Sequence, residues 1–157
     1  MKVLFINKGK TETFIDDDVY EWASKLNWRT TRNYVNRTDK NNKYVSLHRL
    51  IVGAKKGQYV DHIDGNPLNN IRQNLRLCTN AENCRNRKIN SKNNSSGAKG
   101  VWKRTDGRQK CWSAEITVNY KKIKLGNFYI KEEAINAYNM AAIEFFGKYA
   151  KLNGDFK

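Results

Sequence analysis

An aspartate and a histidine stand side by side at Asp61 and His62, and two asparagines, Asn74 and Asn83, follow later in the chain. Carboxylate and amide oxygens are ligands that hard divalent cations prefer, and a neutral imidazole can take a proton from water near pH 7. A bound cation offsets negative charge on a phosphate while the base activates the attacking water. These four residues therefore have the chemistry needed to hydrolyse a phosphodiester bond.

The charge balance indicates which phosphodiesters to expect. Of the 157 residues, 30 are Lys or Arg and 15 are Asp or Glu, which gives a formal net charge of +15 at pH 7. An excess of this size is most simply matched by a polyanion, so nucleic acid is the expected partner. The basic segment from Lys88 to Lys124 also contains Trp102, Trp112 and Tyr120, and aromatic residues are unusual on a surface that is merely solvated. We interpret it as a nucleic-acid-binding surface, with a solvated face as the alternative.

The cysteines and the hydropathy pattern exclude several classes of protein. Cys78, Cys84 and Cys111 are odd in number and include no Cys-x-x-Cys pair, which argues against a disulfide scaffold and against a structural zinc site. No apolar run approaches the roughly 18 residues of a membrane span. We therefore expect a cytoplasmic protein that does not associate with a membrane.

Short strands and a helix are predicted before the candidate catalytic residues. Residues 2–6 and 11–15 have strand patterns and should form a hairpin, and the acidic run at residues 16–18 should open an amphipathic helix that covers it. These acids are expected to interact with the helix dipole, although they could also bind a metal. A further strand at Tyr34 and Val35 should pair with residues 43–47, before a helical turn that ends near Gly53.

The order predicted around the candidate site is strand, long loop, strand and helix. Residues 58–62 and 75–78 read as strands, and residues 64–74 are rich in Gly, Pro and Asn and read as a loop. Thr79 or Asn80 can cap a helix that runs to about residue 87.

The positions of Asp61 and His62 in one strand pose a difficulty. Neighbouring residues of a regular strand point to opposite faces, so a single site can use both only if the strand distorts there. In the loop that follows, Asn66, Asn69 and Asn70 are expected to act as turn formers, because Asn tolerates left-handed backbone geometry.

The last part of the chain is predicted to form a second domain at residues 99–157, after a linker at residues 89–98. Strands are predicted at residues 100–104, 111–118 and 121–125, followed by a helix at residues 132–146 that ends at Gly147. We expect a three-stranded antiparallel sheet packed on this helix. The residues predicted to face the core are Trp112, Ala114, Ile116 and Val118 on the sheet, and Ala134, Ala137, Ala141 and Phe145 on the helix.

A set of short motifs falls within residues 44–88, the motif core of a predicted N-terminal domain at residues 1–88 that has a β-rich extension before it. The motifs are His48-Arg49-Leu50, Val60 through Asn66, Asn69-Asn70, Asn74-Leu75-Arg76 and Thr79 through Asn83. This set resembles the HNH homing-endonuclease group of phages and bacteria. The resemblance implies an α+β fold whose active centre is a ββα-metal unit.

The same resemblance implies a role for each candidate residue. Asp61 and Asn83 would be ligands of one Mg²⁺ or Mn²⁺, His62 the general base, and Asn74 the residue that ties the loop and orients the histidine. Asn83 stands where many relatives have histidine, and its amide oxygen suits a hard cation. His48 is interpreted as a packing or supporting residue.

A second set of motifs covers residues 97–153. It includes Gly100-Val101, Trp112 through Ile116, Leu125 through Phe128, Glu132-Glu133-Ala134 and Leu152-Asn153. This set resembles the APETALA/ethylene-responsive-factor DNA-binding domain, which lays its sheet in the major groove of double-stranded DNA. The residues at matching sheet positions are Trp102, Arg104, Trp112 and Lys124, and Lys103 and Lys122 are expected to add contacts to phosphates or bases. Trp102 stands where Arg is usual and Lys124 where Trp is usual, and for Trp112 burial in the core is an equal alternative.

Together these observations predict a metal-dependent DNA endonuclease of the HNH homing type, present in a bacterial or phage-infected cell and directed to its site by the C-terminal domain. A single active centre predicts that a monomer or weak dimer nicks one strand at a time. The first alternative is a DNA-binding regulator with an inactive HNH scaffold, and the second is a nonspecific nuclease or toxin of the same metal fold.

Overall fold

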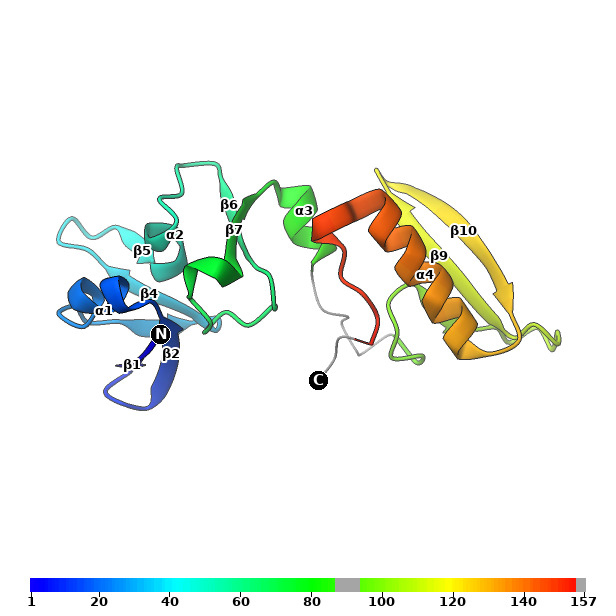
Figure 1. Ribbon diagram of the computed structural model, residues 1–157, viewed down its shortest axis with the longest axis horizontal. Coiled ribbons are helices and arrows are strands. Elements are labelled where there is room, and N and C mark those ends of the chain that lie inside the picture. The colour runs from blue at the N-terminus through cyan, green and yellow to red at the C-terminus, as the bar shows by residue number, and fades with distance from the viewer. Residues whose placement is uncertain (87–93, 155–157) are drawn as a thin grey trace. The chain divides into compact units, whose positions relative to one another are not determined.

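The computed structural model describes residues 1–86 and 94–154 and divides the chain into two compact units, Met1–Asn83 and Cys84–Lys157. The fold is mixed α and β, and its described residues form four small antiparallel sheets (Figure 1). No helix within these described ranges is long and apolar enough to span a membrane.

The first unit begins with the predicted hairpin, formed by β1 (Lys2–Ile6) and β2 (Thr11–Ile15). Helix α1 (Asp17–Ala23) follows, and its buried Val19 and Ala23 share one apolar core with both strands. The helix ends before Leu26, which packs against the same core from beyond the last turn. The prediction of a helix that covers the hairpin is therefore confirmed, with the helix shorter than its apolar pattern.

A three-stranded sheet continues this core. It consists of β3 (Arg29–Thr31), β4 (Tyr34–Thr38) and β5 (Tyr44–Ser46), with β4 in the middle, and it leads into helix α2 (Leu47–Ile51). Strand β3 was not predicted, because its Arg-Thr-Thr sequence contains no apolar residue. Val35 of β4 and Leu47 of α2 are fully buried and join the sheet to the hairpin core.

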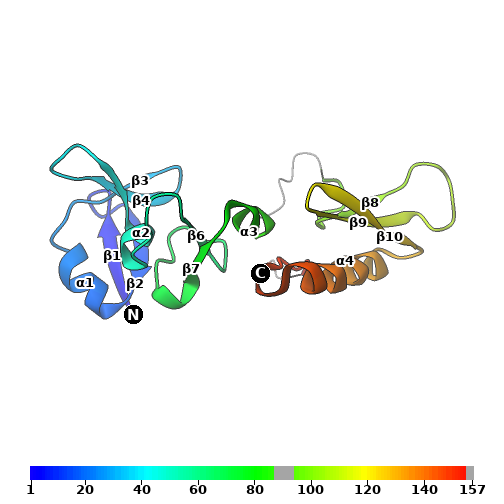
Figure 2. The same ribbon diagram turned by 90° about the horizontal axis from the view of Figure 1, so that it is seen from above.

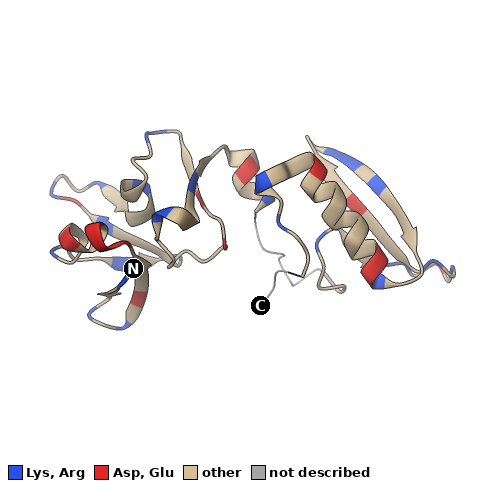
Figure 3. Ribbon diagram, viewed as in Figure 1, with Lys and Arg blue, Asp and Glu red and all other residues tan. Residues whose placement is uncertain are grey.

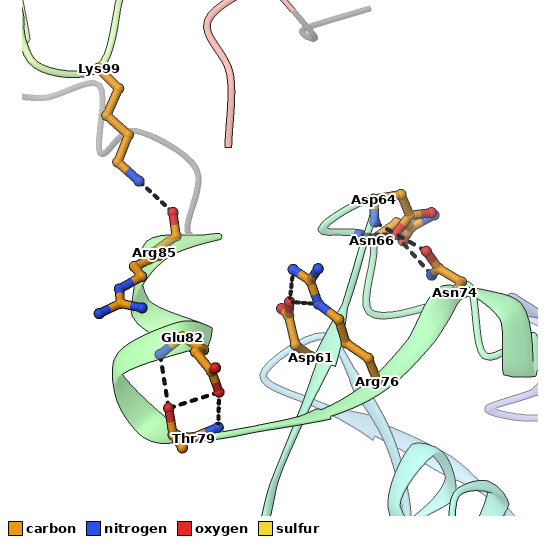
Figure 4. Close-up of polar contacts among 9 residues, drawn as sticks. All are labelled: Asp61, Asp64, Asn66, Asn74, Arg76, Thr79, Glu82, Arg85 and Lys99. Atoms are coloured by element: carbon orange, nitrogen blue, oxygen red, sulfur yellow. Dashed lines mark hydrogen bonds and ion pairs between the residues drawn. The ribbon is translucent and has the colours of Figure 1, made fainter. Parts of the chain in front are cut away.

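The elements around the candidate site follow in the predicted order. β6 (Tyr59–His62) pairs antiparallel with β7 (Leu75–Cys78), and helix α3 (Asn80–Arg85) follows at once. The loop between the strands contains one 3-10 turn, η1 (Arg72–Asn74). The Thr79 N–H and hydroxyl donate to Glu82 Oε2 at 2.7 and 2.9 Å, which is a capping box at the start of α3 (Figure 4). Residue 87, the predicted end of this helix, lies outside the described residues.

The second unit contains the predicted three-stranded sheet, in the order β10-β9-β8. Its elements are β8 (Val101–Lys103), β9 (Trp112–Val118), β10 (Lys121–Phe128), helix α4 (Lys131–Phe146) and the 3-10 turn η3 (Gly147–Tyr149). Helix α4 packs on one face of the sheet (Figure 2). At Gly100 the φ angle is +69°, and an added Cβ would lie 2.3 Å from the Tyr138 ring, so only glycine fits there.

Two predictions about this core need adjustment. Ala134 and Ala141 are buried as predicted, but Phe145 is 41% exposed and Phe146 takes its place in the core. The predicted linker at residues 89–98 falls inside the second unit, and its residues 89–93 lie outside the described residues. In its described part Ser96 and Ala98 are buried, so that part packs as a component of this unit.

Candidate active site

Asp61 is a buried residue of strand β6, and it lies opposite Arg76 of β7 in the antiparallel pair. Nε and Nη2 of Arg76 donate to Asp61 Oδ2 at 2.9 and 2.6 Å (Figure 4). The two side chains are only 14% and 6% exposed, so the attraction acts with little screening by water. The ion pair therefore compensates a carboxylate that would otherwise be costly to bury.

His62 is the last residue of β6, and its side chain is 5% exposed. Its ring lies in an aromatic cluster with Tyr34 and His48, with centroid distances of 5.2 Å to His48 and 6.0 Å to Tyr34. Burial lowers the pKa of His62 from the ordinary histidine value, although Asn70, Asp64 and Asp61 act in the opposite direction. The imidazole is therefore neutral at pH 7, the form that can accept a proton.

The expected distortion of the strand at Asp61 and His62 is not present. Pairing runs without a register shift from Tyr59 opposite Cys78 to His62 opposite Leu75. Alternation along β6 therefore sends the two side chains in different directions, and they can act on one phosphate only at the end of the strand, where His62 is the last residue. The charge of Asp61 still acts on His62 and favours its protonation, so the two groups lie within electrostatic range.

His48 supports this cluster from helix α2. It is 8% exposed, and among the described residues its Nδ1 is a buried atom with no hydrogen-bond partner. Burial, followed by the charges of His62 and Arg49, lowers the pKa of His48 to about 4. The neighbouring Arg49 donates to the carbonyl oxygens of Gln58 and Lys55 at 2.5 and 2.8 Å and so holds the connection into β6.

Asn74 closes the loop between β6 and β7. Its Nδ2 donates to Asp64 Oδ1 at 2.9 Å, and its Oδ1 accepts from the Asp64 N–H at 3.0 Å (Figure 4). Nδ2 also donates to the Asn69 carbonyl at 2.8 Å. The Asn74 carbonyl also accepts from the Ile63 N–H at 2.9 Å. These bonds fix the chain directly after His62, which is where a residue that ties the loop would have to act.

Asp64 is the charged member of this loop network. Burial alone would raise the pKa of its carboxyl, but hydrogen bonds from the Asn66 backbone and the Asn69 and Asn74 side chains lower it. Asp64 is therefore ionised at neutral pH and satisfied by amide donors of its own loop.

Asn83 lies in helix α3, half-buried, and its N–H donates to the Thr79 carbonyl at 3.0 Å. Cys78, the last residue of β7, is influenced by both Asp61 and the start of this helix. Burial, followed by the charges of Asp61 and Glu82, raises the pKa of Cys78 to about 11. Asp61 and Asn83 thus both belong to the strand-strand-helix segment, as the sequence predicted.

The donor types of Asp61 and Asn83 fit a hard divalent cation. Both side chains offer oxygen, and a carboxylate has about four lone-pair positions, enough for an arginine and a cation together. Within the described part of the chain, no group of three or more His, Cys, Asp and Glu side chains is placed to hold a metal. A cation here would therefore take its remaining ligands from water and from the substrate phosphate, as is usual for Mg²⁺.

The N-terminal hairpin holds the loop in place, and sequence reasoning did not find this contact. The Phe14 N–H donates to the Leu68 carbonyl at 2.9 Å, and the Asn70 N–H donates back to the Phe14 carbonyl at 2.8 Å. Asn70, interpreted from sequence as a turn former, is fully buried beside His62. The Asn69-Asn70 pair was noticed in the sequence, but the residues of β2 that Asn70 contacts are far away in the sequence.

The acidic run at residues 16–18 also contacts this loop. Asp16 accepts from the Arg72 N–H at 2.9 Å, and both oxygens of Asp18 accept from the Arg72 guanidinium, at 2.8 and 2.5 Å. Asp17 pairs with the N-terminal ammonium at 3.0 Å. In addition to lying in the first turn of a helix, these acids therefore pair with cations of the protein itself.

The predicted DNA-contacting residues of the second unit divide between the two faces of its sheet. Cross-strand partners share a face of the sheet. The face away from α4, here called the open face, carries three such pairs: Trp102 with Ser113, Lys124 with Glu115, and Lys122 with Thr117. Alternation along the chain places Arg104 on the side of Trp102. Lys103 pairs with Trp112 on the other face, and Trp112 is half-buried against the core.

Charges on the open face are partly paired. Lys122 Nζ lies 3.1 Å from Glu115 Oε1, and Arg104 pairs with Asp106. Trp102 is 40% exposed, and basic residues run along β10 (Figure 3). The open face thus combines an exposed aromatic ring with lysines, a composition common at nucleic-acid interfaces.

Comparison with known proteins agrees with the arrangement of the first unit. A family model described as HNH endonuclease matches residues 45–85. An uncharacterized HNH endonuclease of Acanthamoeba polyphaga mimivirus is 34% identical over 159 residues, covering 94% of this chain and 78% of the relative. Protein 3.8 of Escherichia phage T7 is 44% identical over 68 residues, covering 43% of this chain and 53% of that protein. No solved structure matches significantly.

The chain belongs to the HNH endonuclease family. Membership of this family supports nuclease activity, with DNA as the substrate. Proteins of this family generally use a divalent metal ion.

Proposed function

We propose that this protein is a metal-dependent DNA endonuclease of the HNH homing type that hydrolyses phosphodiester bonds, with His62 as its general base. The observation that carries the proposal is a buried, neutral imidazole at the end of β6, next in the chain to a buried carboxylate. Among the side chains of the first unit, this pair matches the needs of hydrolysis most closely, because one member can accept a proton and the other can ligate a cation.

The remaining residues of the site have supporting roles in this proposal. Asp61 and Asn83 would hold one Mg²⁺ or Mn²⁺, and the ββα-metal arrangement of β6, β7 and α3 would present them. When bound, the cation would supply positive charge that offsets the charge on the scissile phosphate and its leaving oxygen. His62 removes a proton from the attacking water, Asn74 holds the loop after His62 rigid, and Arg76 keeps the Asp61 carboxylate in place.

The second unit is proposed to bind double-stranded DNA in the manner of an APETALA/ethylene-responsive-factor domain. Support comes from its three-stranded sheet on one helix and from the open face that carries Trp102, Lys122 and Lys124, with Arg104 at its edge. Lys103 and Trp112 face the helix side, so we assign the main contacts to the open face. The unit would bring the nuclease site to its target, as a homing enzyme requires.

The described residues contain one candidate active centre, which supports cleavage of one strand at a time. A monomer or weak dimer would therefore produce nicked DNA first, and linear DNA only after a second event. A plasmid nicking assay with Mg²⁺ or Mn²⁺, with and without chelator, tests this directly. We expect wild type to nick and His62→Ala to bind DNA equally well without nicking.

The assay also separates the proposal from its alternatives. A regulator with an inactive scaffold predicts DNA binding by wild type without any cutting. A nonspecific nuclease predicts cutting that continues after the second unit is disabled by substitutions on its open face. Equal cutting by wild type and His62→Ala would remove His62 from the mechanism.

A further inference from the structure

Asn70 connects three parts of the first unit through one side chain. It is fully buried, although it belongs to the loop between β6 and β7. Its Oδ1 lies 3.4 Å from His62 Nε2, and its Nδ2 donates to Thr13 Oγ1 at 2.8 Å and to the Pro67 carbonyl at 3.2 Å. The side chain therefore links the histidine at the end of β6 to strand β2 of the N-terminal hairpin.

The partners of Asn70 fix which way its amide points. A carbonyl oxygen can only accept, so the atom that faces Pro67 O has to be the amide nitrogen. The Thr13 hydroxyl already donates its hydrogen to the Leu68 carbonyl at 2.7 Å, so toward Asn70 it acts as an acceptor. Both contacts place Nδ2 on the hairpin side. A flipped amide would set acceptor against acceptor in a buried position, which is strongly unfavourable.

The orientation of this amide determines the hydrogen on His62. Because Oδ1 is an acceptor, the His62 nitrogen that faces it has to carry a hydrogen, and that nitrogen is Nε2. A neutral imidazole with hydrogen on Nε2 has its lone pair on Nδ1. We propose that Asn70, oriented by Thr13, is a positioning residue that keeps the hydrogen of His62 on Nε2 and makes Nδ1 the nitrogen that takes the proton from water.

The N-terminal hairpin would thus take part in catalysis, although it is far from Asp61 and Asn83 in the sequence. Strand β2 holds the loop by two backbone bonds at Phe14, one to Leu68 and one to Asn70 itself, so Thr13 and Asn70 cannot shift separately. A change in either residue should act through the tautomer of His62 and leave the DNA-binding surface untouched. The assignment of Nδ1 as the base rests on the proposed nuclease function, whereas the tautomer itself does not.

The tautomer can be measured without any cutting. The chain contains two histidines, so the ¹⁵N spectrum of metal-free protein labelled at the imidazoles contains two ring systems. A His62→Gln variant identifies the signals of His62. At pH 7.5 we expect long-range ¹H–¹⁵N correlations to show a protonated Nε2 and an unprotonated Nδ1. A His62 ring with its hydrogen on Nδ1 would overturn the proposal and leave the nuclease function standing.

Substitution at Asn70 tests its role. Asn70→Ala removes the acceptor, so His62 should become a mixture of tautomers, and kcat for nicking should fall about 10- to 100-fold, the loss typical of a missing outer-shell partner, with KM for DNA unchanged. Asn70→Asp keeps an acceptor next to Nε2, so the hydrogen on Nε2 should be retained, but it loses the donor to Thr13 and the Pro67 carbonyl and should be less stable. Asn36→Ala is the matched control, because Asn36 is also buried but donates to the Tyr34 carbonyl.

The Asn36→Ala control should keep the wild-type tautomer of His62 even if this variant is less stable than wild type. If Asn70→Ala also kept a pure Nε2–H tautomer, Asn70 would not be the residue that determines it. Thr13→Val should lower kcat, but by less than Asn70→Ala does. Thr11→Val is its control, because it removes a hydroxyl of the same strand that accepts a hydrogen bond from Asn7, and it should lower kcat less than Thr13→Val. Equal kcat values for the two valine variants would remove Thr13 from the proposal.

Discussion

Arg76 lies directly opposite Asp61 in the β6–β7 ladder and donates to its carboxylate through both Nε and Nη2. The pair joins the two strands that carry the candidate site at a point where Asp61 is buried and Arg76 is largely covered. It also means that any cation held by Asp61 would share that carboxylate with a permanent positive charge. The site is therefore built around one ion pair before any metal is bound.

Removal of one partner of this pair should destabilise the first unit strongly. Arg76→Met leaves the Asp61 carboxylate buried without compensation, and we expect the free energy of unfolding in urea to fall by about 3 kcal/mol or more. Arg72→Met on the neighbouring loop is the matched control, because its pairing with Asp18 is exposed to solvent and should contribute much less to stability. Asp61→Asn in the Arg76→Met background should recover part of the loss. A loss below 1 kcal/mol for Arg76→Met would show that the pair is not structural.

The depressed pKa of His48 predicts a loss of stability in mild acid. The unfolded chain binds a proton near the ordinary value of 6.5, whereas the folded chain does so only at about 4, so acid favours unfolding between these values. From pH 6.5 to pH 4 the contribution of His48 should fall by up to about 3 kcal/mol. His62, whose pKa is also lowered, adds to the loss in the same direction. Urea unfolding measured across this range tests the prediction.

The matched variant for that measurement is His48→Gln, which cannot take up a proton. Its free energy of unfolding should depend less steeply on pH than that of wild type between pH 6.5 and 4. A parallel pH dependence in the two proteins would mean that His48 is protonated as readily in the folded chain as in the unfolded one.

The open face of the second unit is expected to contact phosphate. Lys124→Ala should weaken binding to double-stranded DNA and reduce the slope of log K against log salt by about one unit, the change for one lost phosphate contact. Lys121→Ala is the matched control, because Lys121 lies on the same strand but pairs with Val118 on the helix side. Equal slopes for Lys124→Ala and wild type in a salt titration would refute the assignment.

Much of this fold follows from short-range patterns in the sequence. The bounds of β1 and β2 were predicted to the residue, because two short runs rich in apolar and β-branched residues were separated by a polar turn with glycine. The 3-residue strand β3 was missed, because it lies in a sheet only through its pairing with β4. On α4 the buried residues include Ala134, Tyr138, Ala142 and Phe146, which follow one another at a spacing of four, so Phe146 and not Phe145 reaches the core.

The candidate site was only partly accessible to the same reasoning. His62, Asp61, Asn74 and Asn83 were found as types of residue at motif spacing, and they fall on the predicted elements. The ion pair of Arg76 required the register of two strands, and the contacts of Asn70 required a strand far away in the sequence. Such long-range contacts leave no periodic signal, and an asparagine in a loop is equally well explained as a turn former.

The central claim is that Asp61 and Asn83 hold one divalent cation beside His62. Binding of Mn²⁺ followed by electron paramagnetic resonance tests it most directly, with wild type compared with Asp61→Ala, Asn83→Ala and His62→Gln. The account predicts one bound Mn²⁺ per wild-type chain, an affinity more than about tenfold lower in the Asp61 and Asn83 variants, and binding close to wild type in His62→Gln. Mn²⁺ affinity that is unchanged by loss of both Asp61 and Asn83 would contradict it.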